Sequence, residues 1–176
     1  MTMRLQPFGN STFQCLLYVA LLVTMGGCSP SDDVIDIFTG KRWKMTFIAL
    51  EGNYKQYDFW NRDDDARTAS MKLLASDNTF VLTFEGASLN GVVNGGIGGK
   101  GVLATLGADS HWSVTEGSRA ITLSVSFTGS ETDALAKAFV NGLQHCFRYE
   151  GDNDNLYLYY HSGQNVMFMA FKPQRK

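Results

Sequence analysis

Apolar and polar residues alternate along several short stretches of this chain, and the alternation predicts β-strands. The stretch RWKMTFIAL at 42–50 shows it clearly, with Trp43, Met45 and Phe47 at every second position. Similar stretches recur at 78–85, 111–116, 119–127, 144–150, 156–160 and 166–171. An antiparallel sheet can bury one face and leave the other in water, so strict alternation favours antiparallel pairing. Short turns separate the last three stretches, which together predict a meander.

One stretch instead has the 3.6-residue period of a helix. In residues 131–142 the apolar side chains form a single stripe, and Ser130 and Asp133 stand at the positions of an N-cap and its capping-box partner. Residues 66–75 fit a short helix and an irregular strand equally well. The pattern therefore predicts an α+β fold that is mostly β: a strongly curved antiparallel sheet or small partial barrel, flanked by one main helix at about 131–142.

A glycine-rich stretch, SLNGVVNGGIGGKG at 88–101, interrupts the pattern. Gly96, Gly98 and Gly101 satisfy the spacing GxGxxG, but a dinucleotide site also needs a preceding strand and a following helix in a βαβ unit. The residues after Gly101 are short, β-like and soon reach another glycine, and Lys100 is not followed by the Ser or Thr of a phosphate-binding loop. We therefore expect a strongly bent hairpin with bulges, where glycine permits close approach of backbones.

The N-terminal part of the chain has the pattern of a signal peptide. Its uncharged apolar core, residues 15–25, is 11 residues long, too short for a helix to cross a hydrocarbon layer of about 30 Å. The core ends in Met25-Gly26-Gly27-Cys28, which resembles the lipobox of bacterial lipoproteins. We expect cleavage before Cys28 and acylation of that cysteine, which would hold the protein on a membrane without a spanning helix. The alternative is an ordinary secretory signal followed by a chance cysteine.

This interpretation divides the chain into a signal peptide (1–27), a tether (28–37) and a single folded domain (38–176). It also predicts a lipid-anchored protein of the outer membrane, on the periplasmic side or at the cell surface, because no Asp directly follows Cys28 to signal retention in the inner membrane. The nearby acidic pair at 32–33 resembles the surface-export signal of Bacteroidetes lipoproteins. The membrane, reached through N-terminal acyl chains, is thus the first predicted partner.

The charge and the cysteine content bear on two further questions, nucleic-acid binding and disulfide formation. The chain has 15 Lys and Arg against 17 Asp and Glu, a formal net charge of −2, and it lacks a run of basic residues. Nucleic-acid binding is therefore not expected. Of the three cysteines, Cys15 leaves with the signal peptide and Cys28 carries lipid, so Cys146 has no partner for a disulfide. A lone thiol of this kind is expected to be buried.

An aromatic group between the first two predicted strands is the candidate binding site. Tyr54, Tyr57, Phe59 and Trp60 lie close together among Asn, Gln and Asp residues. They suit either packing at the rim of the sheet or a stacking platform for a sugar or another flat ligand. The adjacent Asp63–Asp65 triplet lacks the Asp-x-Asp-x-Asp-Gly spacing of a calcium loop and suits a solvated helix N-terminus better. No metal site and no cofactor is predicted.

The sequence offers no constellation for catalysis. His111, His145 and His161 are scattered over one predicted strand and two strand ends, and the motifs HExxH and GxSxG are absent. We therefore predict a protein without enzymatic activity: a binding, adaptor or structural module of the cell envelope, with a glycan, a peptide or another protein as partner. An alternative is a periplasmic folding helper or inhibitor that captures extended peptides along an exposed strand edge.

The order of these elements resembles that of META-domain (HslJ-like) proteins, and in particular the uncharacterised META-like lipoproteins of Bacteroidetes. The resemblance runs from about Phe38 to Pro173 and is carried by Trp43, Phe84, Gly91, Trp112, Ser113, Phe139, Leu143, Tyr149, Gly151, Asp152, Leu156 and Phe168. It implies a small curved sheet flanked by a helix, an envelope location linked to secretion or stress, and no established catalysis. Many META domains carry a Gly-Cys-Asn motif in the glycine-rich hairpin. This chain lacks the cysteine there, so no role of that motif is transferred.

Overall fold

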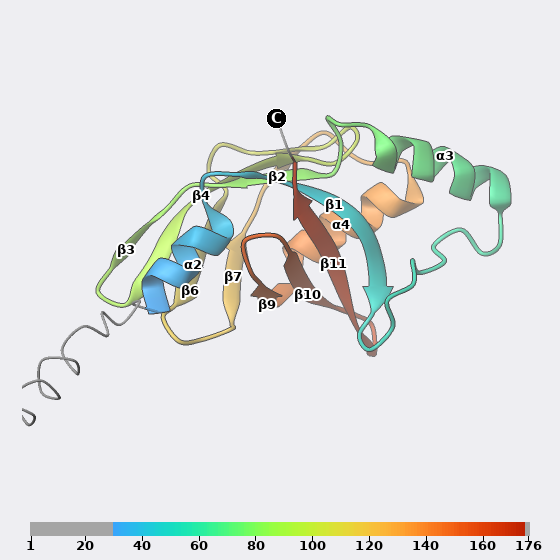
Figure 1. Ribbon diagram of the computed structural model, residues 1–176. Helices are drawn as coiled ribbons and strands as arrows, with labels where there is room; N and C mark the ends of the chain where they lie inside the picture. Colours follow the sequence, from blue (N-terminus) through green and yellow to red (C-terminus); the bar gives the residue numbers. More distant parts are fainter. Residues whose placement is uncertain (1–29, 175–176) are drawn as a thin grey trace, which may run out of the picture.

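The computed structural model describes residues 30–174, which form a curled sheet with helices packed on it (Figure 1). The helices are α2 (Pro30–Phe38), α3 (Asp64–Ala75) and α4 (Ala134–Gln144). The strands are β1 (Arg42–Leu50), β2 (Val81–Phe84), β3 (Ala87–Leu89), β4 (Val92–Lys100), β5 (Thr105–Leu106), β6 (His111–Thr115), β7 (Ile121–Ser124), β8 (Phe127–Thr128), β9 (Cys146–Gly151), β10 (Leu156–Ser162) and β11 (Asn165–Pro173). Strand β1 has the predicted bounds, and the predicted C-terminal meander is present as β9, β10 and β11.

The strands of the sheet pair in antiparallel fashion. Neighbours follow the order β7-β6-β4-β2-β1-β11-β10-β9, while β3 pairs with β4, and β5 pairs with both β4 and β8. The sheet curls until its outermost strands approach each other. Ala120 and Arg148 form an isolated bridge there, and the Tyr149 N–H donates to the Arg119 carbonyl oxygen over 2.9 Å. The predicted class, α+β and mostly β with a strongly curved antiparallel sheet, is confirmed.

The inner face of the curl holds the main hydrophobic core. Helix α4 packs against β10 and β11 (Figure 1), and its side chains Leu135, Phe139 and Leu143 are fully buried. Trp43 and Met45 of β1 enter the same core. Each large apolar side chain buried in this way stabilises the fold by roughly 1.5–3 kcal/mol. The alternation of Trp43 and Met45 therefore reflects this buried face, whereas a register shift between Met45 and Phe47 turns Phe47 to the opposite side of the sheet.

Helix α2 lies where a tether was expected over residues 28–37. The Phe38 ring at its end is fully buried in a cage of aromatic rings, with centroid distances of 4.6 Å to Trp112 and 4.9 Å to both Phe84 and Tyr149. A residue so placed belongs to the folded domain, because the inside of the sheet would be empty without it. The described part of the expected tether is therefore a structural element.

The glycine-rich stretch forms the β3–β4 hairpin, as predicted. Asn90 and Gly91 occupy its turn with φ of 53° and 77°, the left-handed pair that the favoured two-residue hairpin turn requires. Beyond the turn, β4 passes so close to the end of β2 that a Cβ atom on Gly95 would lie 1.9 Å from the Glu85 carbonyl oxygen. Glycine is required there because the two backbones are in contact.

An aspartate caps the N-terminus of each of the two longer helices. The Asp63 carboxylate accepts from the Ala66 N–H over 3.0 Å, which confirms that the Asp63–Asp65 triplet marks a helix N-terminus. The Asp133 carboxylate accepts from the Ala136 N–H over 2.9 Å in the same way. Helix α4 therefore begins directly after Asp133, later than the sequence pattern indicated.

Glu131, predicted as the first residue of that helix, has a different role. Its carboxylate accepts hydrogen bonds from three consecutive backbone N–H groups at 2.8–3.1 Å, those of Val102, Leu103 and Ala104. These bonds hold the turn between β4 and β5 against the start of α4. Since the carboxylate is committed to another loop, the helix starts at the next residue that can cap it.

The predicted strand at 119–127 is interrupted between β7 and β8. The Ser126 N–H donates to Ser110 Oγ over 3.2 Å, and the Ser126 carbonyl oxygen accepts from the Gly107 N–H over 3.0 Å. These bonds go to a neighbouring loop instead of continuing the ladder with β6. The interruption therefore depends on a contact between distant residues that alternation alone does not reveal.

Replacing Glu131 by Ala leaves three backbone N–H groups without their acceptor. We expect the free energy of unfolding to fall by about 1–3 kcal/mol, the usual cost of unsatisfied hydrogen-bonding groups. Glu116→Ala is the matched control, because that carboxylate accepts a single surface hydrogen bond from Ser88, and it should cost less than about 0.5 kcal/mol. Urea unfolding measures both variants, and equal losses would contradict the role assigned to Glu131.

Candidate functional site

The four aromatic residues proposed from the sequence do not form one platform. Tyr54 is 77% exposed, and its ring centre lies 5.9 Å from that of Phe168 on β11. Tyr57, Phe59 and Trp60 instead pack in series along the loop before α3, with successive ring centres 4.9 and 6.1 Å apart. The structure thus separates Tyr54 from the other three.

Trp60 is a packing residue. Its indole is buried, and the indole N–H donates to Ser70 Oγ over 2.7 Å. Ser70 is fully buried in α3 and donates in turn to the Asp133 carboxylate, which caps α4. This chain of hydrogen bonds fixes the loop and both helices to one another, which fits the packing role that the sequence left open for Trp60.

A larger aromatic cluster lies on the outer face of β1, β9, β10 and β11, opposite the main core. Phe168 is at its centre, and its ring centre lies 5.5–5.9 Å from those of Phe47, Tyr54, Tyr157 and Tyr159. We call this surface the outer aromatic face and define it by Phe47, Tyr54, Phe147, Arg148, Tyr157, Tyr159, His161 and Phe168.

Arg148 and His161 add polar groups to the outer aromatic face. The Arg148 guanidinium lies 4.0 Å from the centre of the Tyr159 ring and pairs with the Glu51 carboxylate. His161 stacks on Phe147, with ring centres 4.3 Å apart and planes 10° from parallel. The hydrogen bond with Glu51 raises the pKa of the Arg148 guanidinium, which therefore stays cationic above the aromatic rings.

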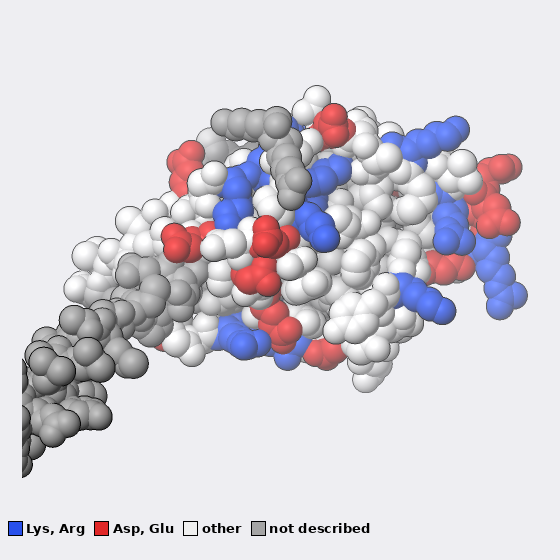
Figure 2. Space-filling model, in the orientation of Figure 1, with Lys and Arg blue, Asp and Glu red and all other residues white. Residues whose placement is uncertain are grey.

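The edge of the outer aromatic face is polar. The Tyr159 hydroxyl donates to Glu150 over 3.1 Å, and Arg119 lies 3.8 Å from the same carboxyl group. Burial, together with this hydrogen bond, raises the pKa of Tyr159 to about 12, so the phenol stays neutral and remains a donor at ordinary pH. Figure 2 shows the lower part of the area over β1 and β11 as largely uncharged, with charged residues above and beside it. Such a surface suits a ligand that has apolar ring faces and polar substituents.

Sequence reasoning missed this face, although two strands carry a signal for it. Strand β10 reads LYLYYHS and β11 reads NVMFMAFKP. Successive residues of a strand point to opposite faces, and in both strands the residues of each of these two sets are largely apolar or aromatic. A sheet with one face in water has polar residues in one of the two sets. Aromatic residues in both sets indicate that the second face is also covered, or that it binds a partner.

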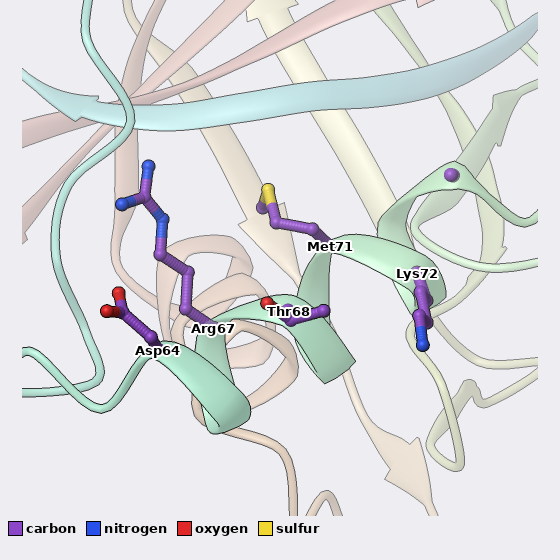
Figure 3. Close-up of a pocket in the computed structure, with 6 residues that line it drawn as sticks. Asp64, Arg67, Thr68, Met71 and Lys72 are labelled. Atoms are coloured by element: carbon purple, nitrogen blue, oxygen red, sulfur yellow. The ribbon is translucent and has the colours of Figure 1, made fainter.

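A hollow of about 480 Å³ beside α3 is a weaker candidate. Its lining comes from that helix alone: Asp64, Arg67, Thr68, Met71, Lys72 and Ala75. Figure 3 shows Arg67 and Met71 projecting from one side of the helix and Lys72 from another, so the side chains do not converge on one point. Ligand sites usually have a few polar groups that converge.

The histidines of the described chain lie on separate elements. His111 Nδ1 is 3.2 Å from the Asp109 carbonyl oxygen, His145 caps the end of α4, and His161 belongs to the outer aromatic face. Ser126 Oγ donates to the Asp109 carboxylate and not to a histidine, so it lacks the base that a serine nucleophile needs. Within residues 30–174, no three His, Cys, Asp or Glu side chains gather as they would around a metal ion.

The sequence matches a family described as a domain of unknown function, DUF4847, over residues 30–173. The chain belongs to the DUF4847 family. The crystal structure of a DUF4847 family protein from Bacteroides vulgatus ATCC 8482 is similar to it, with a TM-score of 0.53 and 18% sequence identity over 81% of this chain and 99% of that one. At this identity the likeness shows a shared fold. No protein with a curated description matches the chain, and neither this family nor this crystal structure is described as a META domain.

Two cysteines of this DUF4847 protein were assigned roles from the sequence. Cys28, the predicted lipid attachment site, lies outside the described residues. Cys146 is partly buried in β9, with Sγ 3.9 Å from the Arg148 carbonyl oxygen, and burial raises the pKa of its thiol to about 12. In the described part of the chain, no helix is long and apolar enough to cross a membrane.

The raised pKa of Cys146 predicts how stability depends on pH. The thiol ionises near pH 9 in the unfolded chain and near pH 12 in the folded one. Its contribution to stability is therefore fully present below pH 9 and is lost as the pH rises toward 12. We expect Cys146→Ala to lose less stability than the wild type between pH 9 and 11, as measured by Tm.

Burial also raises the pKa of Tyr159, but this residue is present in both proteins, so the difference between their curves isolates the thiol. Parallel curves for the two proteins would contradict the prediction. A second measurement is alkylation of the folded wild type at pH 8, which should be at least about tenfold slower than alkylation of the unfolded chain, because the thiolate is the nucleophile.

Proposed function

We propose that this DUF4847 protein is a non-catalytic, lipid-anchored protein of the outer membrane that binds a saccharide on its outer aromatic face. The observation that carries the proposal is the cluster of rings around Phe168 on the side of the sheet opposite the core. Phe168 and Tyr159 are almost fully buried and hold the neighbouring rings in place, while Tyr54 is 77% exposed. The face therefore combines a fixed base with a ring that is accessible to a ligand.

The chemistry of a sugar ring matches this arrangement. A pyranose has apolar faces made of C–H groups and a rim of hydroxyl groups. The apolar face suits an exposed aromatic ring such as Tyr54, and the hydroxyl groups suit the donors and acceptors of Arg148 and Glu51 at the border. Rings that are already fixed lose little conformational freedom when a ligand binds, which favours recognition through few contacts.

A kinship with META-domain proteins forms part of the same proposal, since that resemblance also implies an envelope location and no catalysis. The folding helper or inhibitor is the second candidate. Strand β3 favours it, because its three residues are all exposed and its described pairing is with β4 alone. An exposed strand edge of this kind can pair with an extended peptide.

Cys28→Ser tests the lipid anchor. The substitution removes the thiol that would carry acyl chains, so we expect the protein to move from the membrane fraction to the soluble fraction. Cys146→Ser is the matched control and should leave the fractionation unchanged. Mass spectrometry of the mature N-terminal peptide measures acylation directly. A Cys28→Ser protein that is still cleaved before residue 28 and still membrane-bound would contradict the anchor.

Tyr54→Ala tests the binding face. Glycans that bind the full chain are first identified by a thermal-shift screen and then titrated by calorimetry. Removing an exposed stacking ring costs roughly 1.5 kcal/mol, so we expect the Kd to rise about tenfold. Tyr57→Ala is the matched control, because it removes the same side chain from the same loop, where the Tyr57 ring packs on Phe59 outside the outer aromatic face.

Three results would count against this assignment. A larger effect of Tyr57→Ala would move the site to the loop before α3. Hydrolysis of a bound glycan that one point mutation abolishes would contradict the non-catalytic part of the proposal. Suppression of client aggregation by a protein that binds none of the glycans would favour the folding helper instead.

A further inference from the structure

We propose that the β3–β4 hairpin rests on the membrane surface, where the Leu89 side chain enters the lipid interface beside the acyl chains. The proposal rests on the proposed acylation of Cys28 and adds a defined orientation of the domain to it. The surface concerned is distinct from the outer aromatic face, since it belongs to β3 and β4.

The short link between anchor and fold restricts how the domain can lie. Helix α2 begins at Pro30, and Ser29 alone separates that residue from Cys28 in the sequence. Two peptide units span at most about 8 Å. Acyl chains on Cys28 therefore bring the N-terminal end of α2 to the bilayer surface. The burial of Phe38 in the core ties the other end of the helix to the sheet, so the whole domain follows.

The β3–β4 hairpin lies at the same end of the molecule. Helix α2 contacts both β3 and β4, and Figure 1 shows its N-terminal end next to the turn of the hairpin. The hairpin is fixed in place by the turn after β6. The Glu116 N–H donates to the Gly91 carbonyl oxygen over 2.9 Å, and the Glu116 carboxylate accepts from Ser88 Oγ over 2.9 Å. An anchor that brings α2 to the bilayer thus brings the hairpin with it.

The composition of the hairpin suits contact with lipid. Residues 87–92, ASLNGV, carry no charge, and Leu89 is 69% exposed although its side chain is large and apolar. Keeping a leucine in water is unfavourable, and moving it among lipid groups recovers that free energy. The residues of the hairpin tip are therefore themselves uncharged and include one exposed apolar side chain, with the Glu116 carboxylate beside them at Ser88.

One leucine alone binds a membrane only weakly, but a weak contact is sufficient to orient a domain that acyl chains already hold at the surface. Burial of a leucine side chain favours the inserted position by roughly tenfold or more. The acyl chains already hold the hairpin at the surface, so the contact forms within one tethered molecule, where the effective concentration is high. The expected consequence is a preferred orientation of the domain.

A lipid-quenching experiment with two labelled positions tests the proposal. Leu89→Cys and Leu103→Cys, each in the full chain with Cys146→Ala, give one thiol for the fluorophore NBD. Leu103 is the matched control, a 57% exposed leucine just after β4, and the nine residues of that strand set the two positions up to about 30 Å apart. The acylated proteins are reconstituted in phosphatidylethanolamine and phosphatidylglycerol vesicles that contain doxyl-labelled phosphatidylcholine.

We expect doxyl lipid to quench NBD at position 89 at least about threefold more strongly than at position 103. Equal quenching at both positions, in protein that floats with the vesicles and carries its acyl chains by mass spectrometry, would overturn the hairpin contact and leave the anchor intact. A protein that carries no acyl chain at Cys28 would overturn both. The two failures are therefore distinguishable.

Discussion

The fold depends on how the curled sheet is filled where its two outermost strands approach each other. Phe38, the last residue of α2, lies among rings from β2, β6 and β9, strands that are far apart in the order of the sheet. The Trp43 indole N–H donates to the Phe38 carbonyl oxygen over 3.2 Å, so the residue is held through its backbone as well. One buried ring thus joins parts of the sheet that otherwise meet at the Ala120–Arg148 bridge.

Helices α2 and α4 pack on the inner face of the curled sheet and therefore leave the outer face to be covered by other residues. Within the described residues, the cluster on the outer face of β1, β9, β10 and β11 is built from strand residues that cover one another. Phe168 is 2% exposed there, and the rings around it shield it from water. The outer aromatic face is therefore a second, smaller core as well as a candidate binding surface. This double role explains how exposed rings can be held in fixed positions without a helix over them.

Features that depend on neighbouring residues could be predicted from the sequence. Alternation located β1, the glycine-rich stretch indicated the bent β3–β4 hairpin, and the acidic triplet marked the start of α3. Features that depend on distant residues could not. The start of α4 was misplaced because Glu131 binds amides of 102–104, and Tyr54 was grouped with its sequence neighbours although its ring packs on Phe168. Residues 28–37 were expected to be a tether to a domain that starts at Phe38, because the sequence does not show that the described part of this segment is a helix whose last ring is enclosed by rings from three strands.

The firm connection of α2 to the sheet also bears on the proposed lipid anchor and on the proposed saccharide-binding face. A long flexible linker lets a domain rotate freely about its anchor. Here the helix begins two residues after Cys28 in the sequence and ends inside the core, so the proposed anchor would leave the sheet only a short link to the membrane. The hairpin beside α2 belongs to β3 and β4, whereas the outer aromatic face belongs to β1, β9, β10 and β11. Under the two proposals, a domain oriented by that hairpin would keep its aromatic rings at a constant angle to the bilayer, so a ligand's access to the rings would depend on the anchor as well as on the rings.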